Sequence, residues 1–206
     1  MTIYLRRIRM SGKTMVLIIA GLLLVGCVPS LHCLYNEKTL EYDPKLVGCW
    51  GEGPGDDDEK WSFTGDAEKK VYKLTITEEK GKISILEAHL VNLDGKRFLD
   101  LAPSEDERME QFGGWYRVHL LGAHTFLQVH QTDPNLVVSV MDPDKTKKLL
   151  AEKPQLLKHE IVDDRVVLTA STEQLQAFFK DENNLKAVFG EPKAMKRLPA
   201  EQLKPQ

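Results

Sequence analysis

The stretch Tyr72-Lys73-Leu74-Thr75-Ile76-Thr77 alternates apolar and polar side chains, and this alternation decides the fold class. Successive side chains of a β-strand point to opposite faces, so a period of two predicts a strand with one buried face. Beyond the turn Glu79-Lys80-Gly81 the alternation returns with Leu86, Ala88 and Leu90 on one face. Asp94-Gly95 then predicts a tight hairpin, because both central residues of its turn need positive φ.

Similar short runs continue along most of the chain. Residues 46–50, 61–63, 115–120, 126–130, 157–162 and 165–169 have strand character, and residues 136–141 are apolar on both faces. The links are of hairpin length, which predicts a mainly β fold. We expect an antiparallel meander barrel or sandwich of about eight to ten short strands.

Two peripheral helices are expected beside the strands. Asp142-Pro143 provides an N-cap followed by proline at the first helical position, and that helix runs to Pro154. Ser171-Thr172-Glu173-Gln174 has the spacing of a capping box. The following Leu175, Phe178 and Phe179 lie on one helical stripe, which suits packing on a sheet.

The N-terminus predicts export. Residues 1–13 carry four basic residues and no acidic one, and residues 15–25 are apolar. Leu24-Val25-Gly26-Cys27 then resembles the lipobox of bacterial lipoproteins, which implies cleavage between Gly26 and Cys27 and acylation, such as by palmitate, of Cys27. The alternative, an uncleaved membrane-spanning helix, would need about 20 apolar residues, more than the run at 15–25 provides. Val28 rather than Asp follows the cysteine, so the resemblance implies the outer membrane if the cell is Gram-negative.

Four segments follow from this interpretation: a cleaved signal peptide (1–26), a lipidated N-terminus and tether (27–43), a β-rich globular domain (44–189) and a flexible polar tail (190–206). Removing the first segment changes the formal net charge from −3 to −7, because it deletes four positive charges. An acidic chain argues against nucleic acid as a partner. The expected partner is the membrane, through the lipid on Cys27, and no protein partner is identified.

The other two cysteines, Cys33 and Cys49, leave two alternatives open. An oxidising compartment permits a disulfide between them, which would staple the tether to the first strand of the domain. The alternative is two unpaired thiols, with Cys49 acting as a small buried apolar residue.

Gly48-Cys49-Trp50 resembles the Gly-x-Trp motif of lipocalins. The resemblance implies that Gly48 and Trp50 lie at the base of an eight-stranded barrel, with a later arginine packed against the tryptophan. Thr132-Asp133-Pro134 matches two of the three residues of the family's Thr-Asp-Tyr motif. The closing arginine is not assigned, since Arg165 opens the last expected strand but the helix at 143–152 interrupts the family's order. The alternative to a barrel-base role is that Trp50 is an ordinary core aromatic residue.

Candidate catalytic and metal-binding residues are few. His119, His124 and His130 do not fall on one strand face, and Asp56-Asp57-Asp58-Glu59 lacks the spacing of a calcium loop. The chain has no Gly-x-Ser-x-Gly elbow, and Ser84 and Ser139 lie in strands. Glu87 and Asp100 could share a sheet face as paired carboxylates. We therefore assign no catalytic residue, metal or cofactor.

Three functions stay open at this point. The first is a membrane-anchored envelope module that binds a small apolar or amphipathic ligand in a lipocalin-like barrel. The second is a non-enzymatic structural or interaction protein of the envelope. The third is an enzyme, a hydrolase with an unrecognised site.

Overall fold

The computed structural model describes residues 27–53, 59–78, 81–104 and 112–199. The expected signal peptide, residues 1–26, lies outside the described residues, as do residues 56–58 of the acidic run. Within the described ranges, no helix is both long enough and apolar enough to cross a membrane.

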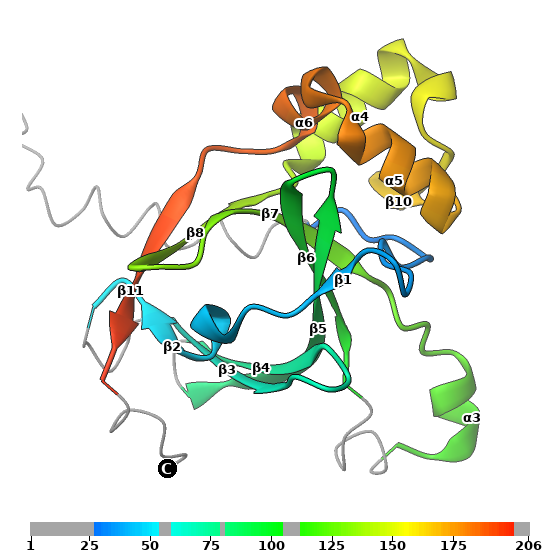
Figure 1. Ribbon diagram of the computed structural model, residues 1–206. Helices are drawn as coiled ribbons and strands as arrows, with labels where there is room; N and C mark the ends of the chain where they lie inside the picture. The colour runs from blue at the N-terminus through cyan, green and yellow to red at the C-terminus, as the bar shows by residue number, and fades with distance from the viewer. Residues whose placement is uncertain (1–26, 54–58, 79–80, 105–111, 200–206) are drawn as a thin grey trace, which may run out of the picture.

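Eight antiparallel strands close into a barrel (Figure 1). Each strand pairs with the next along the chain, and the last pairs back with the first, so the barrel has no free edge. A ninth short strand, β1 (Leu40–Glu41), pairs with Leu90 and Val91 of β5, beyond the part of β5 that pairs with β4. The barrel strands are β2 (Gly48–Gly51), β3 (Lys60–Asp66), β4 (Val71–Thr77), β5 (Ile83–Leu93), β6 (Lys96–Pro103), β7 (Thr125–Gln131), β8 (Asn135–Val140) and β11 (Lys193–Leu198).

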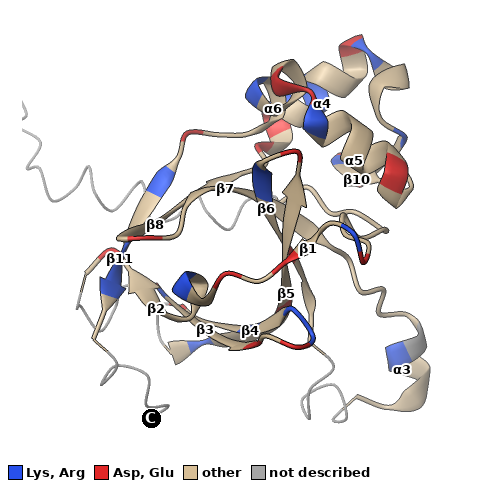
Figure 2. Cartoon of the chain, in the orientation of Figure 1, with Lys and Arg blue, Asp and Glu red and all other residues tan. Residues whose placement is uncertain are grey.

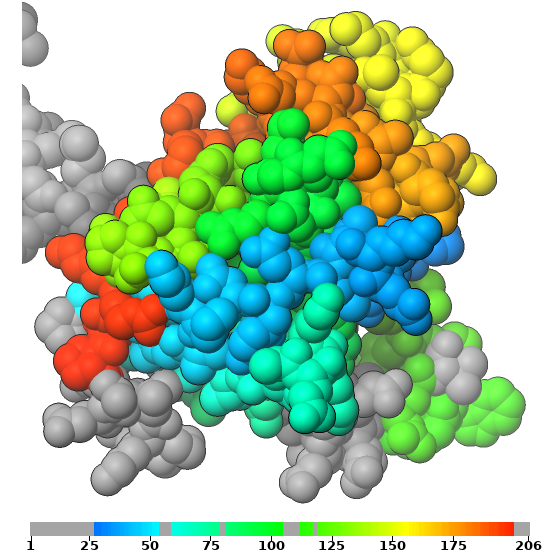
Figure 3. Space-filling view, in the orientation of Figure 1, coloured from blue at the N-terminus to red at the C-terminus, as the bar shows by residue number. Residues whose placement is uncertain are grey.

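The link from β8 to β11 is a long insertion that forms a second layer. It holds α4 (Pro143–Glu152), the 3-10 turn η4 (Pro154–Leu156), the hairpin β9 (His159–Val162) with β10 (Arg165–Leu168), α5 (Thr172–Lys180) and α6 (Glu182–Val188). Yellow and orange spheres in Figure 3 show this insertion covering one side of the barrel. The two expected helices are confirmed as α4 and α5, each with the expected cap.

Two hydrophobic cores result, because alternate residues of the barrel wall face opposite ways. Leu99 points into the barrel, while its neighbour Phe98 packs against Phe179 and Phe189 of the insertion. The inner core has thirteen buried residues: Leu46, Trp50, Phe63, Tyr72, Leu74, Ala88, Leu90, Leu99, Leu101, Leu127, Val129, Leu136 and Val138. Charged residues of both signs are interspersed over barrel and insertion (Figure 2).

The expected tether is instead part of the folded body. Val28 is 2% exposed and, with Leu34, belongs to the outer core. Ser30 exchanges two backbone hydrogen bonds of 2.8 Å with His124, and its flanking residues bond to Leu168. The segment lacks a strand or helix period because it makes isolated bridges rather than a regular element, so its burial is not visible in the sequence pattern.

The expected flexible tail is also corrected. Residues 193–198 form β11, which pairs with β8 on one side and β2 on the other. Four of its six residues are exposed, and polar and apolar side chains do not alternate along it, so the pattern did not reveal a strand. Strand formation here follows from the free edges that β2 and β8 present to the chain.

A third correction concerns residues 115–120, which were expected to form a strand. The chain instead forms the short helix α3 (Gly114–Val118), which projects from the lower right of the molecule in Figure 1. The N–H groups of Tyr116 and Arg117 donate to the carbonyl of Gly113. No buried sheet face is available to this segment, since Trp115 and Tyr116 are largely exposed.

Candidate ligand-binding site

One end of the barrel is closed by an arginine stacked on a tryptophan. Trp50 in β2 is fully buried and its indole N–H donates to the Leu46 carbonyl at 2.9 Å. The guanidinium carbon of Arg197, from β11, lies 4.1 Å from the Trp50 ring centroid. Arg197 also donates to the carbonyls of Val47, at 2.8 Å, and Lys45. These carbonyls border the 3-10 turn η2 (Pro44–Leu46), so the arginine joins the first and last barrel strands to the turn.

Gly48 is required by this arrangement. Its φ of +138° is strained for any residue with a side chain, and a Cβ added there would overlap the Nη1 atom of Arg197. The Gly-x-Trp spacing therefore has a physical meaning in this chain. The glycine leaves room for the guanidinium, and the tryptophan two residues on supplies the ring beneath it.

A polar cluster ties the strands together at the same end. Asp43 caps η2 by accepting the Lys45 N–H, and it also accepts from Thr132 Oγ1 at 2.7 Å and from Arg97 Nη1 at 3.0 Å. Burial alone would raise the Asp43 pKa, but these three hydrogen bonds and the Arg97 charge outweigh it and lower the pKa. The Tyr72 hydroxyl accepts the Asp43 N–H at 2.6 Å. Thr132, predicted as part of a second motif, thus meets the turn that precedes the first motif.

The barrel interior is apolar but less completely covered toward the end where β3 and β7 begin and β4 and β8 stop. Several side chains directed into the barrel are only half-buried there, and one of them, Trp61, lies directly opposite the fully buried Trp50 in the β2–β3 pair. The register places Trp61 opposite Ile76, and Val140 opposite Leu127, toward this end of their strands. Half-buried apolar residues also adjoin the turn η2, namely Tyr42 and Val47. The remaining half-buried set is Trp61, Ile76, Leu86, Val140 and Met195, which we call the open-end lining.

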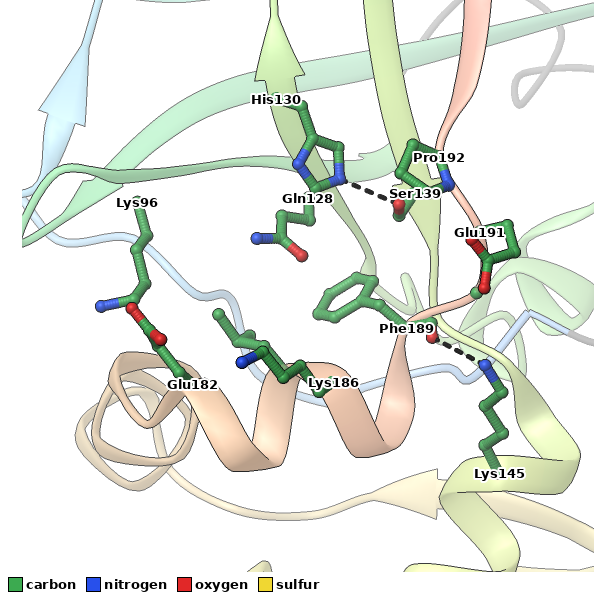
Figure 4. A pocket seen from close by; sticks show the side chains of 12 residues that line it. Lys96, Gln128, His130, Ser139, Lys145, Glu182, Lys186, Phe189, Glu191 and Pro192 are labelled. Atoms are coloured by element: carbon green, nitrogen blue, oxygen red, sulfur yellow. Dashed lines mark hydrogen bonds between the residues drawn. The ribbon is translucent and has the colours of Figure 1, made fainter.

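A separate groove of about 420 Å³ lies outside the barrel, between the outer face of β7 and β8 and the helix α6 (Figure 4). His130 Nε2 and Ser139 Oγ are 2.9 Å apart in its wall, and burial lowers the pKa of His130. Among the described residues, no carboxylate hydrogen-bonds to His130, so the pair does not form a catalytic triad. Lys96, Lys145, Lys186, Glu182 and Glu191 give the groove a mixed charge.

The three histidines considered as metal ligands, His119, His124 and His130, lie apart. His119 is exposed at the end of α3, His130 lines the groove, and His124 pairs with Asp100. In the parts of the chain that the structure describes, no cluster of three or more His, Cys, Asp or Glu residues could hold a metal ion.

Asp100 and His124 hold the N-terminal segment against the barrel wall. Asp100 is 1% exposed; its Oδ1 lies 2.6 Å from His124 Nδ1 and its Oδ2 accepts the Leu34 N–H at 2.6 Å. The Tyr35 ring stacks on His89, the strand partner of Asp100, at 4.0 Å. Glu87 lies two residues from His89 on the same outer face, where it approaches the His89 ring at 3.8 Å. Asp100 and Glu87 therefore make separate contacts, and the buried Asp100 acts as a structural clamp that holds the N-terminal segment in place.

Cys33 and Cys49 are both free thiols. Cys33 Sγ lies 3.7 Å from Thr172 Oγ1 at the start of α5, whereas Cys49 is buried in β2, where burial raises its thiol pKa. In the structure the two thiols lie in separate surroundings and are not bonded to each other.

Arg197 is the residue that sequence reasoning missed. It lies in the stretch expected as a tail, and Arg165, which opens β10, is on a hairpin outside the barrel. The available signal was topological: seven meander strands leave two edges unpaired, and a closed barrel needs one more strand after the insertion.

Comparison with protein-family models, with curated proteins and with solved structures finds no match. The class of the protein therefore follows from its own geometry, an eight-stranded antiparallel barrel with an apolar interior, in which Arg197 stacks on Trp50.

Proposed function

We propose that the chain is a lipocalin-like carrier, anchored in a membrane through lipid on Cys27, that holds a small apolar or amphipathic molecule at the open-end lining. The observation that supports this most directly is the contact of Arg197 with Trp50 above Gly48. An arginine packed on the tryptophan is what the lipocalin resemblance implies for the barrel base, and half-buried apolar side chains at the ends of β4 and β8 adjoin the barrel interior. Ligand sites in eight-stranded barrels lie at the open mouth.

The carrier proposal is tested by native mass spectrometry of residues 27–206 exported to a periplasm. This span contains every barrel strand and both hydrophobic cores, so it is the folded body of the protein. We expect a reproducible additional mass that is lost on denaturation. A bare polypeptide mass in repeated preparations would favour the alternative, a structural or interaction protein of the envelope.

A dye experiment locates the site. A fluorescent fatty acid should bind the protein, and Val140→Arg should weaken binding at least tenfold by placing a charge in the apolar lining. The matched control is Val162→Arg, since Val162 is an exposed valine on β9, outside the barrel. Trp61→Arg repeats the test from a facing strand if the Val140 variant fails to fold. Equal dye affinity in all variants would contradict binding at the open end.

The anchor is tested separately in cells. Cys27→Ala should move the protein from the membrane fraction to the soluble exported fraction or leave the leader uncut, while the control Cys33→Ala should not. In a Gram-negative host we propose the outer membrane as the location, because Val28 follows the cysteine. Unchanged cleavage and membrane fractionation of Cys27→Ala would refute the anchor without bearing on ligand binding.

A further inference from the structure

The segment 112–121 exposes several large apolar side chains. Trp115 is 87% exposed and Leu121 is 76% exposed, and Phe112, Tyr116 and Leu120 are also exposed. We call these five residues the α3 patch. Phe112 and Tyr116 stack on each other with ring centroids 5.0 Å apart, so the patch is organised locally without being covered by the rest of the described chain.

The composition of the α3 patch suits a lipid surface. Tryptophan and tyrosine prefer the boundary between headgroups and acyl chains, where a ring has one apolar and one wet side. Residues 112–124 contain Arg117, His119 and His124 and no acidic residue, although the chain after residue 26 has a net charge of −7. In Figure 2 the helix α3 accordingly shows blue and no red. A surface with exposed aromatic side chains, one arginine and no acidic residue suits the interface of a bilayer.

The patch lies near the position where the chain would be acylated. Ser30, three residues after Cys27, is bridged to His124, three residues after Leu121. Three residues span at most about 11 Å and a bridge about 5 Å, so Cys27 and Leu121 are within about 27 Å of each other. Val28 is buried, so no tether separates a lipidated Cys27 from the body. An acylated Cys27 would therefore hold this part of the molecule close to the bilayer.

We propose that the α3 patch is a membrane-docking surface that inserts into the headgroup region of the bilayer and, with Cys27, fixes the orientation of the barrel. This inference rests on the proposed anchor for its geometry. The link from β6 to β7 carries α3 and runs from Pro103 to Thr125. Pro103 pairs with the half-buried Leu86, and Thr125 lies two residues before Leu127, which pairs with the half-buried Val140. The link therefore leaves the barrel beside the open-end lining. Docking through α3 therefore turns the open-end lining toward the lipid, where an apolar ligand would be exchanged.

The test uses residues 27–206 with Cys27→Ser, which carries no acyl chain, and vesicles of phosphatidylcholine and phosphatidylglycerol in equal parts. We expect the protein to float with the vesicles and the Trp115 emission to shift to the blue. The double variant Trp115→Ala with Leu121→Ala should lower the partition coefficient about tenfold or more, as the loss of two apolar side chains from lipid requires. The matched control Ile161→Ala with Val162→Ala removes two exposed apolar residues from β9 and should bind like the parent.

A second variant keeps the test decisive if the double variant does not fold. Trp115→Phe should retain most of the partitioning and lose most of the blue shift, because the remaining Trp50 and Trp61 belong to the barrel interior. Absence of vesicle binding by the parent would overturn the proposal. So would equal partitioning of the patch and control variants, or sedimentation showing that the patch instead joins two copies of the chain.

These outcomes are independent of the anchor experiment, since the tested protein has no lipid. If Cys27→Ala leaves cell fractionation unchanged while the vesicle result holds, the anchor fails and the docking surface stands. If vesicle binding fails while Cys27→Ala releases the protein, the anchor stands and the docking surface fails.

Discussion

Replacing Gly48 by alanine tests whether Arg197 and Gly48 form one unit at the closed end. An alanine at φ +138° costs about 1–3 kcal/mol of backbone strain. Its methyl group also occupies the place of the Arg197 Nη1 atom, so the guanidinium must leave the Trp50 ring. The lost cation–π contact and two hydrogen bonds from an exposed arginine are worth about 2 kcal/mol together. We expect Gly48→Ala to lower the unfolding free energy by about 3–5 kcal/mol.

Arg197→Ala alone should cost about 2 kcal/mol, the value of the same contacts. The double variant should then be no less stable than Gly48→Ala, because both changes remove the one set of arginine contacts and the strain is counted once. Urea denaturation of residues 27–206, followed by tryptophan fluorescence, measures all four proteins of the cycle. Gly122→Ala is the control, since a methyl group there meets nothing within 4 Å. Additive losses in the double variant would refute the shared-space reasoning.

Three further predictions concern the polar cluster, the outer core and the clamp. Asp43→Asn should destabilise the protein at pH 7, and the difference in stability from the parent should shrink below about pH 4. A carboxylate whose pKa is lowered by folding stabilises the fold above its unfolded pKa, and this stabilisation is lost as the pH falls through the folded pKa. A pH-independent difference would contradict the assigned charge. Phe179→Ala should lower the unfolding free energy measured by urea denaturation by about 3–5 kcal/mol, because the ring is fully buried against four other phenylalanines. A loss below about 1 kcal/mol would show that the insertion does not depend on this core. Asp100→Ala should lower the unfolding free energy by about 3 kcal/mol, since the Leu34 N–H loses its buried acceptor. It should also expose residues 28–36 to proteolysis before global unfolding. Unchanged cleavage rates would argue that Asp100 does not hold this segment in place.

The sequence predicted those parts of the fold that local patterns encode. Alternation at Tyr72, Leu74 and Ile76 and the Asp94-Gly95 turn are confirmed as β4 and the β5–β6 hairpin. The capping box at Ser171 is confirmed with both of its hydrogen bonds. Each of these signals acts over a few residues, where propensity, period and capping geometry agree. A short motif also singled out Gly48 and Trp50, and in the structure Trp50 is the residue on which Arg197 stacks.

Only the tertiary structure decided the elements whose partners are distant in the chain. Arg197 is 147 positions after Trp50, and nothing local distinguishes its strand from a polar tail. The segment beginning at Val28 is buried by contacts with His124 and with β10 rather than by its own pattern. Trp115 carried strand propensity but had no buried face to fill, so it was left exposed on α3. Local chemistry determined that a β barrel forms, while barrel closure and the balance of buried surface determined which residues complete it.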